Sequence, residues 1–155
     1  MGKPVIFESH IREDVVFGEG VKVVQPVNLY GCAIGDGSFI GPFVEIQNDV
    51  KIGSRCKVQS HTFICEGVSV GDDCFIGHGV MFINDLFQTG GPAGGDKSLW
   101  KKTFIGNQVS IGSNATILAV TIGDRVVIGA GAVVTRNISK PGIYAGNPAR
   151  LLRAL

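Results

Sequence analysis

An apolar residue recurs at every sixth position through much of this chain. In the longest unbroken run these residues are Ile34, Ile40, Ile46, Ile52, Val58, Ile64, Val70, Ile76 and Phe82. Glycine often follows directly, as at Gly35 and Gly53, and a small or β-branched residue often stands four positions after the apolar one. A period of six does not fit an α-helix, and simple alternation would not require glycine at one fixed place. Each unit is therefore predicted to be a short strand followed by a tight turn.

The same frame continues on both sides of this run. Its further members are Phe17, Val23, Leu29, Ile105, Ile111, Ile117, Ile122, Ile128 and Val134, with one-residue slips before Ile34 and within ILAVTIG. Three such units make one triangular coil of a parallel β-helix, whose coils stack at about 4.8 Å. The eighteen units thus predict about six coils with ladders of aliphatic side chains inside. Because each coil covers the open strand edges of the next, the solenoid is stable only as a stack.

The residue before each apolar position is expected to lie on a strand and point outwards. Since one face recurs every 18 residues, three outward rows follow: Phe39, Lys57 and Phe75; Glu45, Phe63 and Met81; Lys51 and Ser69. Two of these faces carry large apolar side chains. Contiguous exposed rows of this kind are unusual on a monomer, so we expect these two faces to contact other subunits.

The same spacing predicts which polar turn residues stack. His61 and His78 belong to units 18 residues apart and are expected at one corner of successive coils, whereas Asn48, Glu66 and Asn84 are expected to stack at a second corner. Adjacent corners of one coil are too far apart for side chains to meet. A site that uses both columns would therefore need a second subunit.

The repeat stops at Asn84 and resumes after about Thr103. The intervening segment, NDLFQTGGPAGGDKSLWKKT, is rich in glycine and contains the single tryptophan. Long loops within compact domains are usually functional or disordered. Because Leu86, Phe87 and Trp100 provide apolar anchors, we expect an arm that packs on a neighbouring subunit and lines a cleft.

The pattern aliphatic-Gly-x-x-small-x resembles that of the hexapeptide-repeat acyltransferases, over residues 17–155. The carboxyl-terminal stretch IGAGAVVTRNISKPGIYAGNPARLLRAL is similar to the end of that family. The resemblance implies a left-handed winding, a homotrimer with active sites between subunits, and acetyl-CoA as co-substrate. It also implies that the AGNPAR segment helps to hold the coenzyme and that a short terminal helix follows.

The segment FICEGVSVGDDCFIGHGVMFIND resembles one branch of this family more closely. That branch N-acetylates amino groups on nucleotide-linked sugars, particularly 3-amino sugars made for bacterial surface polysaccharides. In it, the asparagine-aspartate pair after the apolar run lies at the reacting amine, and here that pair is Asn84 and Asp85. The repeat would then stop where the acceptor site begins, because a uniform rod offers no pocket.

The expected organisation is a single all-β domain over residues 1–155. It comprises a left-handed parallel β-helix of about six triangular coils (17–83 and 104–139), one protruding loop (84–103), and a coenzyme-binding segment with a short helix (140–155).

Attack on a thioester requires an uncharged, oriented nucleophile and donors for the developing oxyanion. Asn84 is expected to accept a hydrogen bond from the amine, and Asp85 to fix that amide or to bind the cationic amine. His78 is the preferred side-chain base, although the departing thiolate could itself take the proton. The other candidates are His61, Glu66, Gln47 and Glu45 for the sugar nucleotide, and Gly112, Ala130, Arg136, Lys140, Asn147 and Arg150 for coenzyme A.

Three other functions stay open at this point. An O-acetyltransferase acting on a sugar or serine hydroxyl would need His78 as base more strongly, because a hydroxyl has a much higher pKa than an ammonium group. A metal enzyme resembling the gamma-class carbonic anhydrases would need three histidine ligands, and the three histidines here lack a suitable short spacing. A non-enzymatic scaffold is disfavoured by the AGNPAR terminus.

Composition limits the binding partners and the cellular compartment that we expect for this protein. The net charge of +1 predicts no general affinity for nucleic acid or anionic lipid. No apolar run approaches the roughly 20 residues of a membrane span, and the amino terminus does not resemble a signal peptide. Cys32, Cys56, Cys65 and Cys74 form no CxxC pair and are expected to be buried, unpaired and free of metal. We therefore expect a cytoplasmic protein.

Overall fold

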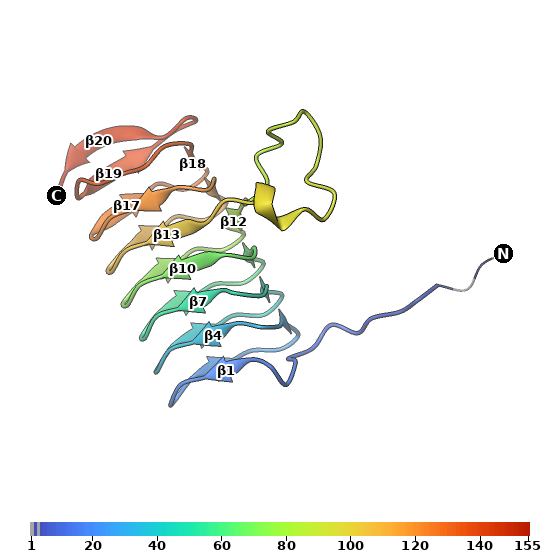
Figure 1. Cartoon of the computed structure of the whole chain (residues 1–155). Helices are drawn as coiled ribbons and strands as arrows, with labels where there is room; N and C mark the ends of the chain where they lie inside the picture. The colour runs from blue at the N-terminus through green and yellow to red at the C-terminus, as the bar shows by residue number, and fades with distance from the viewer. Residues whose placement is uncertain (1, 3) are drawn as a thin grey trace.

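The computed structural model describes residues 2 and 4–155, and within them it forms a β-solenoid of about seven turns without an α-helix (Figure 1). Its coils stack in chain order from the first coil to the carboxyl terminus, and the amino-terminal segment extends away from the first coil. Within the described residues no helix is long and apolar enough to cross a membrane.

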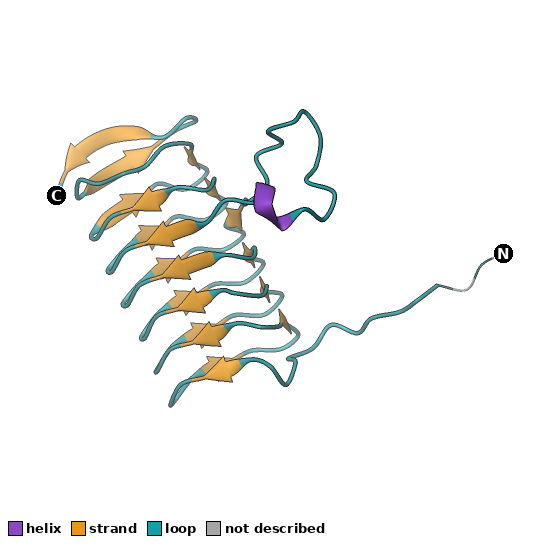
Figure 2. Ribbon diagram, in the orientation of Figure 1, coloured by secondary structure: helices purple, strands orange, loops and turns teal. Residues whose placement is uncertain are grey.

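Three sheets form the sides of the solenoid (Figure 2). The β1 sheet contains β1 (Val16–Phe17), β4 (Ala33–Ile34), β7 (Lys51–Ile52), β10 (Val68–Val70), β13 (Thr103–Ile105) and β16 (Thr121–Ile122). The β2 sheet contains β2 (Lys22–Val23), β5 (Phe39–Ile40), β8 (Lys57–Val58), β11 (Phe75–Ile76), β14 (Ser110–Ile111), β17 (Val126–Ile128), β19 (Gly142–Ala145) and β20 (Arg150–Ala154). The β3 sheet contains β3 (Asn28–Leu29), β6 (Glu45–Ile46), β9 (Phe63–Ile64), β12 (Met81–Phe82), β15 (Thr116–Ile117) and β18 (Val133–Val134).

The predicted repeat frame is confirmed unit by unit. Each apolar residue of the frame ends one of the strands β1 to β18, both slips included, so these strands make six complete coils. A partial seventh coil follows, in which Ile138 bridges to Ile122 and β19 pairs with β17. The prediction of about six coils therefore missed only this last, incomplete turn.

The apolar ladder forms the core. Ile40, Ile46, Val58 and Ile64 are fully buried, like most other members of the frame. Burying one such side chain stabilises the fold by about 1.5–3 kcal/mol. Because the interior is continuous along the axis, no coil has a core of its own and each depends on its neighbours.

The fixed place of glycine has a steric cause. A Cβ at Gly53 would overlap the carbonyl group of Gly71 in the next coil, and one at Gly77 would lie 2.7 Å from the carbonyl oxygen of Ile111. Neither glycine has a positive φ, so space rather than backbone freedom demands it. The left-handed conformation occurs two residues later in the turn, where Arg55 (φ 57°) and Gly79 (φ 64°) adopt it.

The predicted outward rows are confirmed by the strand register. Phe39 and Phe75 both pair with Lys57, and Glu45 and Met81 both pair with Phe63. The third face, however, also carries an exposed aromatic side chain, Phe104, which the sequence analysis did not place there. That the apolar faces contact other subunits stays a prediction.

The expected carboxyl-terminal helix is wrong. Residues Arg150–Ala154 form β20, which pairs antiparallel with β19. A helix this short would be marginal on its own, whereas the open edge of β19 offers backbone groups for pairing. The four cysteines are buried and unpaired as predicted, and burial raises the pKa of Cys32 to about 11 and that of Cys65 to about 12.

Candidate functional site

The turns of successive coils align into three columns, one along each edge of the solenoid. The histidine corner lies between the β2 and β3 sheets and contains Ser60, His61 and His78. The asparagine corner, between the β3 and β1 sheets, contains Glu66 and Asn84. The third, here called the aspartate corner, lies between the β1 and β2 sheets.

The histidine corner orients His78 through the coil before it. The Ser60 hydroxyl and His78 Nδ1 lie 2.9 Å apart, and the Gly79 amide donates to the Ser60 carbonyl at 3.0 Å. With Nδ1 engaged by Ser60, Nε2 is the nitrogen left for a ligand. His61 shares this corner as predicted, but its ring stacks on Phe43, with 4.9 Å between the centroids.

The same column continues towards the carboxyl terminus. The Asn114 amide donates to the His78 carbonyl at 2.8 Å, and the Gly131 amide donates to the Ser113 carbonyl at 2.9 Å. Gly112 lies against Ala130 of the next coil, since a Cβ at Gly112 would overlap the Ala130 backbone nitrogen. The predicted coenzyme positions Gly112 and Ala130 therefore belong to the column that carries His78.

A shallow pocket of about 180 Å³ lies at the carboxyl-terminal end of the solenoid. Arg136 and Arg150, two of the predicted coenzyme residues, both line it, together with Tyr144. Lys140 is outside the pocket lining, and its backbone carbonyl accepts a hydrogen bond from the Tyr144 hydroxyl at 2.9 Å. Two guanidinium groups at one pocket suit a phosphate-bearing ligand.

The asparagine corner brings four predicted residues into one hydrogen-bonded chain. Asn84 Nδ2 donates to the Glu66 carbonyl at 3.1 Å, and the Glu66 amide donates to Gln47 Oε1 at 3.2 Å. Gln47 Nε2 in turn donates to Glu45 Oε1 at 3.1 Å. Because the Asn84 amide nitrogen is held by the backbone of the preceding coil, its oxygen is directed to accept a hydrogen bond from a ligand.

The carboxylate of Glu45 is also held by the first coil. It accepts hydrogen bonds from Asn28 Nδ2 at 3.2 Å and from the Tyr30 hydroxyl at 3.3 Å. Burial and, secondarily, the charge of Glu45 raise the pKa of Tyr30 above its usual value. Glu45 is therefore the last residue of this chain of hydrogen bonds, and the first coil holds it in place.

Asp85 lies next to Asn84 but points into the loop. Its Oδ1 accepts from the Phe87 amide at 2.9 Å and its Oδ2 accepts from the Ala93 amide at 2.7 Å. Both oxygens thus stabilise the loop backbone. The Glu66 carbonyl, rather than Asp85, fixes the Asn84 amide.

The end of the loop folds back onto the asparagine corner. Lys97, in the 3₁₀ turn η1 (Lys97–Leu99), donates to both carboxylate oxygens of Glu66 at 2.8 and 2.7 Å. The ammonium group also lies 5.5 Å from the centroid of the Trp100 ring, and Lys102 pairs with Asp49 at 3.1 Å. These contacts close a small pocket of about 70 Å³ at the corner. Packing of the loop on another subunit stays a prediction.

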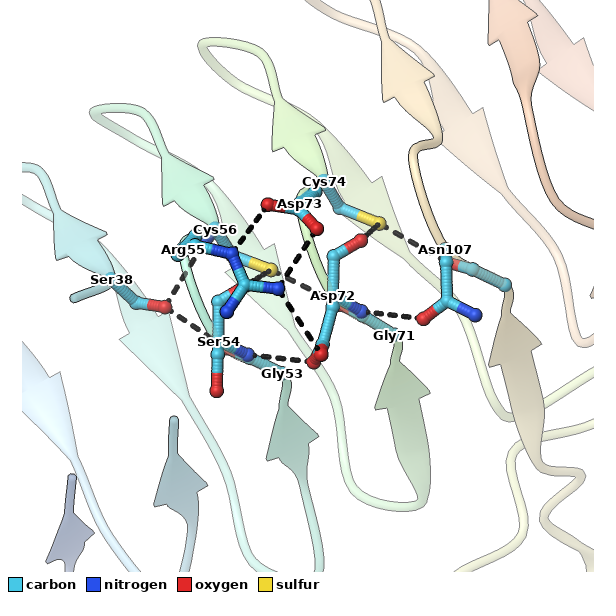
Figure 3. Close-up of polar contacts among 11 residues, drawn as sticks. Ser38, Gly53, Ser54, Arg55, Cys56, Gly71, Asp72, Asp73, Cys74 and Asn107 are labelled. Atoms are coloured by element: carbon cyan, nitrogen blue, oxygen red, sulfur yellow. Dashed lines mark hydrogen bonds and ion pairs between the residues drawn. The ribbon is translucent and has the colours of Figure 1, made fainter. Parts of the chain in front are cut away.

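Figure 3 shows the aspartate corner, where polar side chains connect successive coils. The Ser54 amide donates to Asp72 Oδ1 at 2.9 Å, and the Asp72 amide donates to Asn107 Oδ1 at 2.8 Å. Arg55 donates to Asp73 at 2.7 Å and so lowers the pKa of that carboxyl. Every partner here is another turn of the chain, so we interpret this corner as structural.

Sequence reasoning missed two residues at these corners. Ser60 stands 18 residues before His78, so the coil spacing could have identified it as the neighbour of His78. Lys97 lies within the segment without a repeat, and no periodic signal connects it to Glu66. Across residues 2 and 4–155, no group of three or more histidine, cysteine, aspartate or glutamate side chains could hold a metal ion.

Two family models match parts of the chain. Residues 31–66 match the bacterial transferase hexapeptide repeat, and residues 102–136 match the hexapeptide repeat of succinyl-transferase. Among curated proteins, the bifunctional protein GlmU of Streptococcus uberis is 29% identical over 155 residues, covering 99% of this chain and 31% of its own length. The chain spans between 26% and 33% of the length of such curated relatives.

Three solved structures share the fold. A hexapeptide-repeat acetyltransferase of Vibrio cholerae, complexed with acetyl coenzyme A, is 26% identical, with a TM-score of 0.68 over 81% of this chain and 72% of that one. A variant of perosamine N-acetyltransferase from Caulobacter crescentus, with CoA and GDP-perosamine, is 22% identical, with a TM-score of 0.62 over 92% and 55%. A variant of an N-acyltransferase from Bacillus cereus, with dTDP and coenzyme A, is 22% identical, with a TM-score of 0.71 over 93% and 79%. The matched repeats and the three-sided coil agree that this chain carries hexapeptide repeats that fold into a three-sided β-helix.

Proposed function

We propose that this protein is an acetyl-CoA-dependent N-acetyltransferase that acts on the amino group of a nucleotide-linked amino sugar, in the synthesis of bacterial surface polysaccharide. The observation that carries the proposal is the Asn84 amide, held 3.1 Å from the Glu66 carbonyl at the point where the repeat gives way to the loop. The complexes of the Vibrio, Caulobacter and Bacillus proteins support the donor and the nucleotide-linked acceptor.

In this mechanism Asn84 Oδ1 accepts a hydrogen bond from the acceptor amine and aims its lone pair at the thioester carbonyl. Orientation of this kind can contribute several kcal/mol to a bimolecular step. The amine is uncharged when it attacks, so an acceptor that arrives as an ammonium ion first gives one proton to solvent. The amine nitrogen then attacks the carbonyl carbon, the C–S bond breaks, and the second proton leaves to the coenzyme thiolate or to His78. The Gly112 amide already donates to the Ile128 carbonyl at 2.8 Å, so the donor for the oxyanion is assigned to the turn at Ala130.

Coenzyme A is proposed to run along the histidine corner from His78 past Gly112 and Ala130. Its phosphates would be held by Arg136 and Arg150 at the carboxyl-terminal pocket, with Lys140 and Asn147 nearby in the chain. Because the histidine and asparagine corners flank the two edges of the β3 sheet, the proposed site combines the histidine corner of one subunit with the asparagine corner of another in a homotrimer.

The direct test is thiol release from acetyl-CoA with a panel of nucleotide-linked amino and hydroxy sugars. The proposal expects release with an amino sugar and an amide product by mass spectrometry. Replacing Asn84 by Ala should lower kcat about 100-fold, the loss typical of a misplaced reactant, while the KM for acetyl-CoA stays near its wild-type value. Release with hydroxy sugars alone would contradict the proposal.

O-acetylation of a hydroxyl is the second candidate, and the contact between Ser60 and His78 favours it. That contact orients an imidazole as a general base, which a hydroxyl acceptor needs far more than an amine does. Near-complete loss of activity in His78→Ala would support the hydroxyl acceptor. A partial loss would support the amine.

A further inference from the structure

We propose that the Glu66 carboxylate is the binding site for the ammonium group of the acceptor, and that Lys97 occupies this site until the acceptor displaces it. The inference rests on the proposed N-acetyltransferase function and deepens it. It names the residue that selects an amine over a hydroxyl.

The contact between Glu66 and Lys97 already is a carboxylate bound to a primary ammonium group. Lys97 Nζ lies 2.8 and 2.7 Å from the two oxygens of Glu66. The Glu66 side chain is only 20% exposed, whereas the Lys97 side chain is 60% exposed. The acidic partner lies in the turn between β9 and β10, and the basic partner reaches it from the loop.

The residue that carries this carboxylate lies next to Asn84 in the stack of coils. Asn84 Nδ2 donates to the backbone carbonyl of Glu66 itself, so the two residues occupy adjacent coils of one column. Asp85, which the sequence offered as the site for the cationic amine, has both oxygens bound to backbone amides of the loop. Glu66 takes over the role that the sequence analysis gave to Asp85.

Lysine and a protonated amino sugar present the same group, an ammonium with three donors and one positive charge. A carboxylate that binds one in bidentate fashion is complementary to the other. A hydroxyl acceptor carries no charge and gains much less on displacing Lys97. The competition thus makes binding at the asparagine corner selective for amines.

The loop contains a second ion pair that serves as a matched control. Lys102 Nζ lies 3.1 Å from Asp49 Oδ2, and this pair also joins the end of the loop to the corner. Its side chains are 64% and 55% exposed, so it is the more exposed of the two ion pairs at the end of the loop. Breaking it removes a loop contact of the same kind without changing the occupancy of Glu66.

The experiment compares Lys97→Gln, Lys102→Gln, Glu66→Gln and Asp49→Asn in the full chain. KM and kcat are measured for acetyl-CoA and for the amino acceptor that gives thiol release, and the Kd of that acceptor without coenzyme is measured by calorimetry. Lys97→Gln should lower KM and Kd for the amine about two- to fivefold, the range expected for one exposed ion pair. Glu66→Gln should raise both about tenfold or more, as for the loss of a charged hydrogen bond. Lys102→Gln and Asp49→Asn should change neither.

Two outcomes separate this inference from the function on which it rests. If no amino sugar supports thiol release and hydroxy sugars do, the N-acetyltransferase proposal is wrong and the inference falls with it. If amino sugars are acetylated but Glu66→Gln binds them as tightly as the wild type does, the inference alone is overturned. An equal effect of Lys97→Gln and Lys102→Gln would also overturn it, because both would then act only through the loop.

Discussion

The glycine at the start of each turn provides the sharpest test of how this sequence specifies its coils. In Gly53→Ala the new Cβ would overlap the Gly71 carbonyl oxygen and would lie 2.5 Å from both the Gly71 carbonyl carbon and Asp72 Oδ1. The carbonyl belongs to the backbone of the next coil, so relief requires the two coils to move apart. Overpacking of this kind costs about 1–3 kcal/mol.

A smaller effect opposes this cost. Replacing glycine by alanine where φ is compatible stabilises a protein by about 0.4–1 kcal/mol through the unfolded chain. Because the Gly71 contacts at Gly53 are with backbone atoms that cannot rotate away, the overpacking cost is expected in the upper part of its range, about 2–3 kcal/mol. The net expectation for Gly53→Ala is therefore a loss of about 1–2.5 kcal/mol in the free energy of unfolding. Gly20→Ala is the matched control, since Gly20 has a φ of 66° and nothing within 4 Å of its virtual Cβ. Gly20→Ala should lower the free energy of unfolding only by the strain of a side chain at a left-handed φ, about 1 kcal/mol.

The assay is urea unfolding followed by circular dichroism at a fixed protein concentration. The reasoning is refuted if Gly53→Ala unfolds at the wild-type urea concentration. It is also refuted if Gly20→Ala is the more damaging of the two, since left-handed backbone rather than coil contact would then govern the turns.

The other predictions concern the cysteines, the aspartate corner and the histidine corner. Burial raises the pKa of Cys65 to about 12 and that of Cys32 to about 11, so the thiols should react very slowly with a thiol reagent at pH 8 in the native protein and completely in urea. Rapid labelling of the native protein would contradict the burial. The Arg55 hydrogen bond lowers the pKa of Asp73 in the folded state, so this ion pair stabilises the fold above the unfolded pKa near 4 and loses its effect as pH falls. Arg55→Met should therefore flatten the fall in Tm below about pH 4. A Tm that falls with pH as in the wild type would count against this. Ser60→Ala should lower kcat several-fold and shift the pH-rate profile if Ser60 orients His78, whereas an unaltered profile would leave Ser60 as a turn residue only.

The repeat made most of the fold predictable. The six-residue period with its glycines located every strand from β1 to β18. This worked because the buried apolar positions and the close contacts between coils both recur at regular intervals along the chain. The carboxyl terminus was mispredicted as a helix because Arg150–Ala154 lies beyond the repeat, and an open strand edge decides its conformation. Local sequence does not encode that edge.

In the candidate site, too, contacts between repeating coils were predictable and contacts of the loop were not. Coil spacing predicted that Glu66 and Asn84 share a column and that His61 and His78 share another. It did not predict that Asp85 turns into the loop or that Lys97 reaches Glu66, because contacts made by a non-repeating segment depend on how its backbone closes. The loop is therefore the part where sequence reasoning was weakest and where the structure added most.

The central claim is that the site joins the asparagine corner of one subunit to the histidine corner of another. It is tested by refolding an equal mixture of the Asn84→Ala and His78→Ala proteins and measuring thiol release with the amino acceptor, against each variant refolded alone. Random mixing in a closed homotrimer should restore about a quarter of the wild-type sites, because each such site needs Asn84 from one variant and His78 from the other. Activity of the mixture no higher than the average of the separate variants would contradict the claim and confine the chemistry to a single chain.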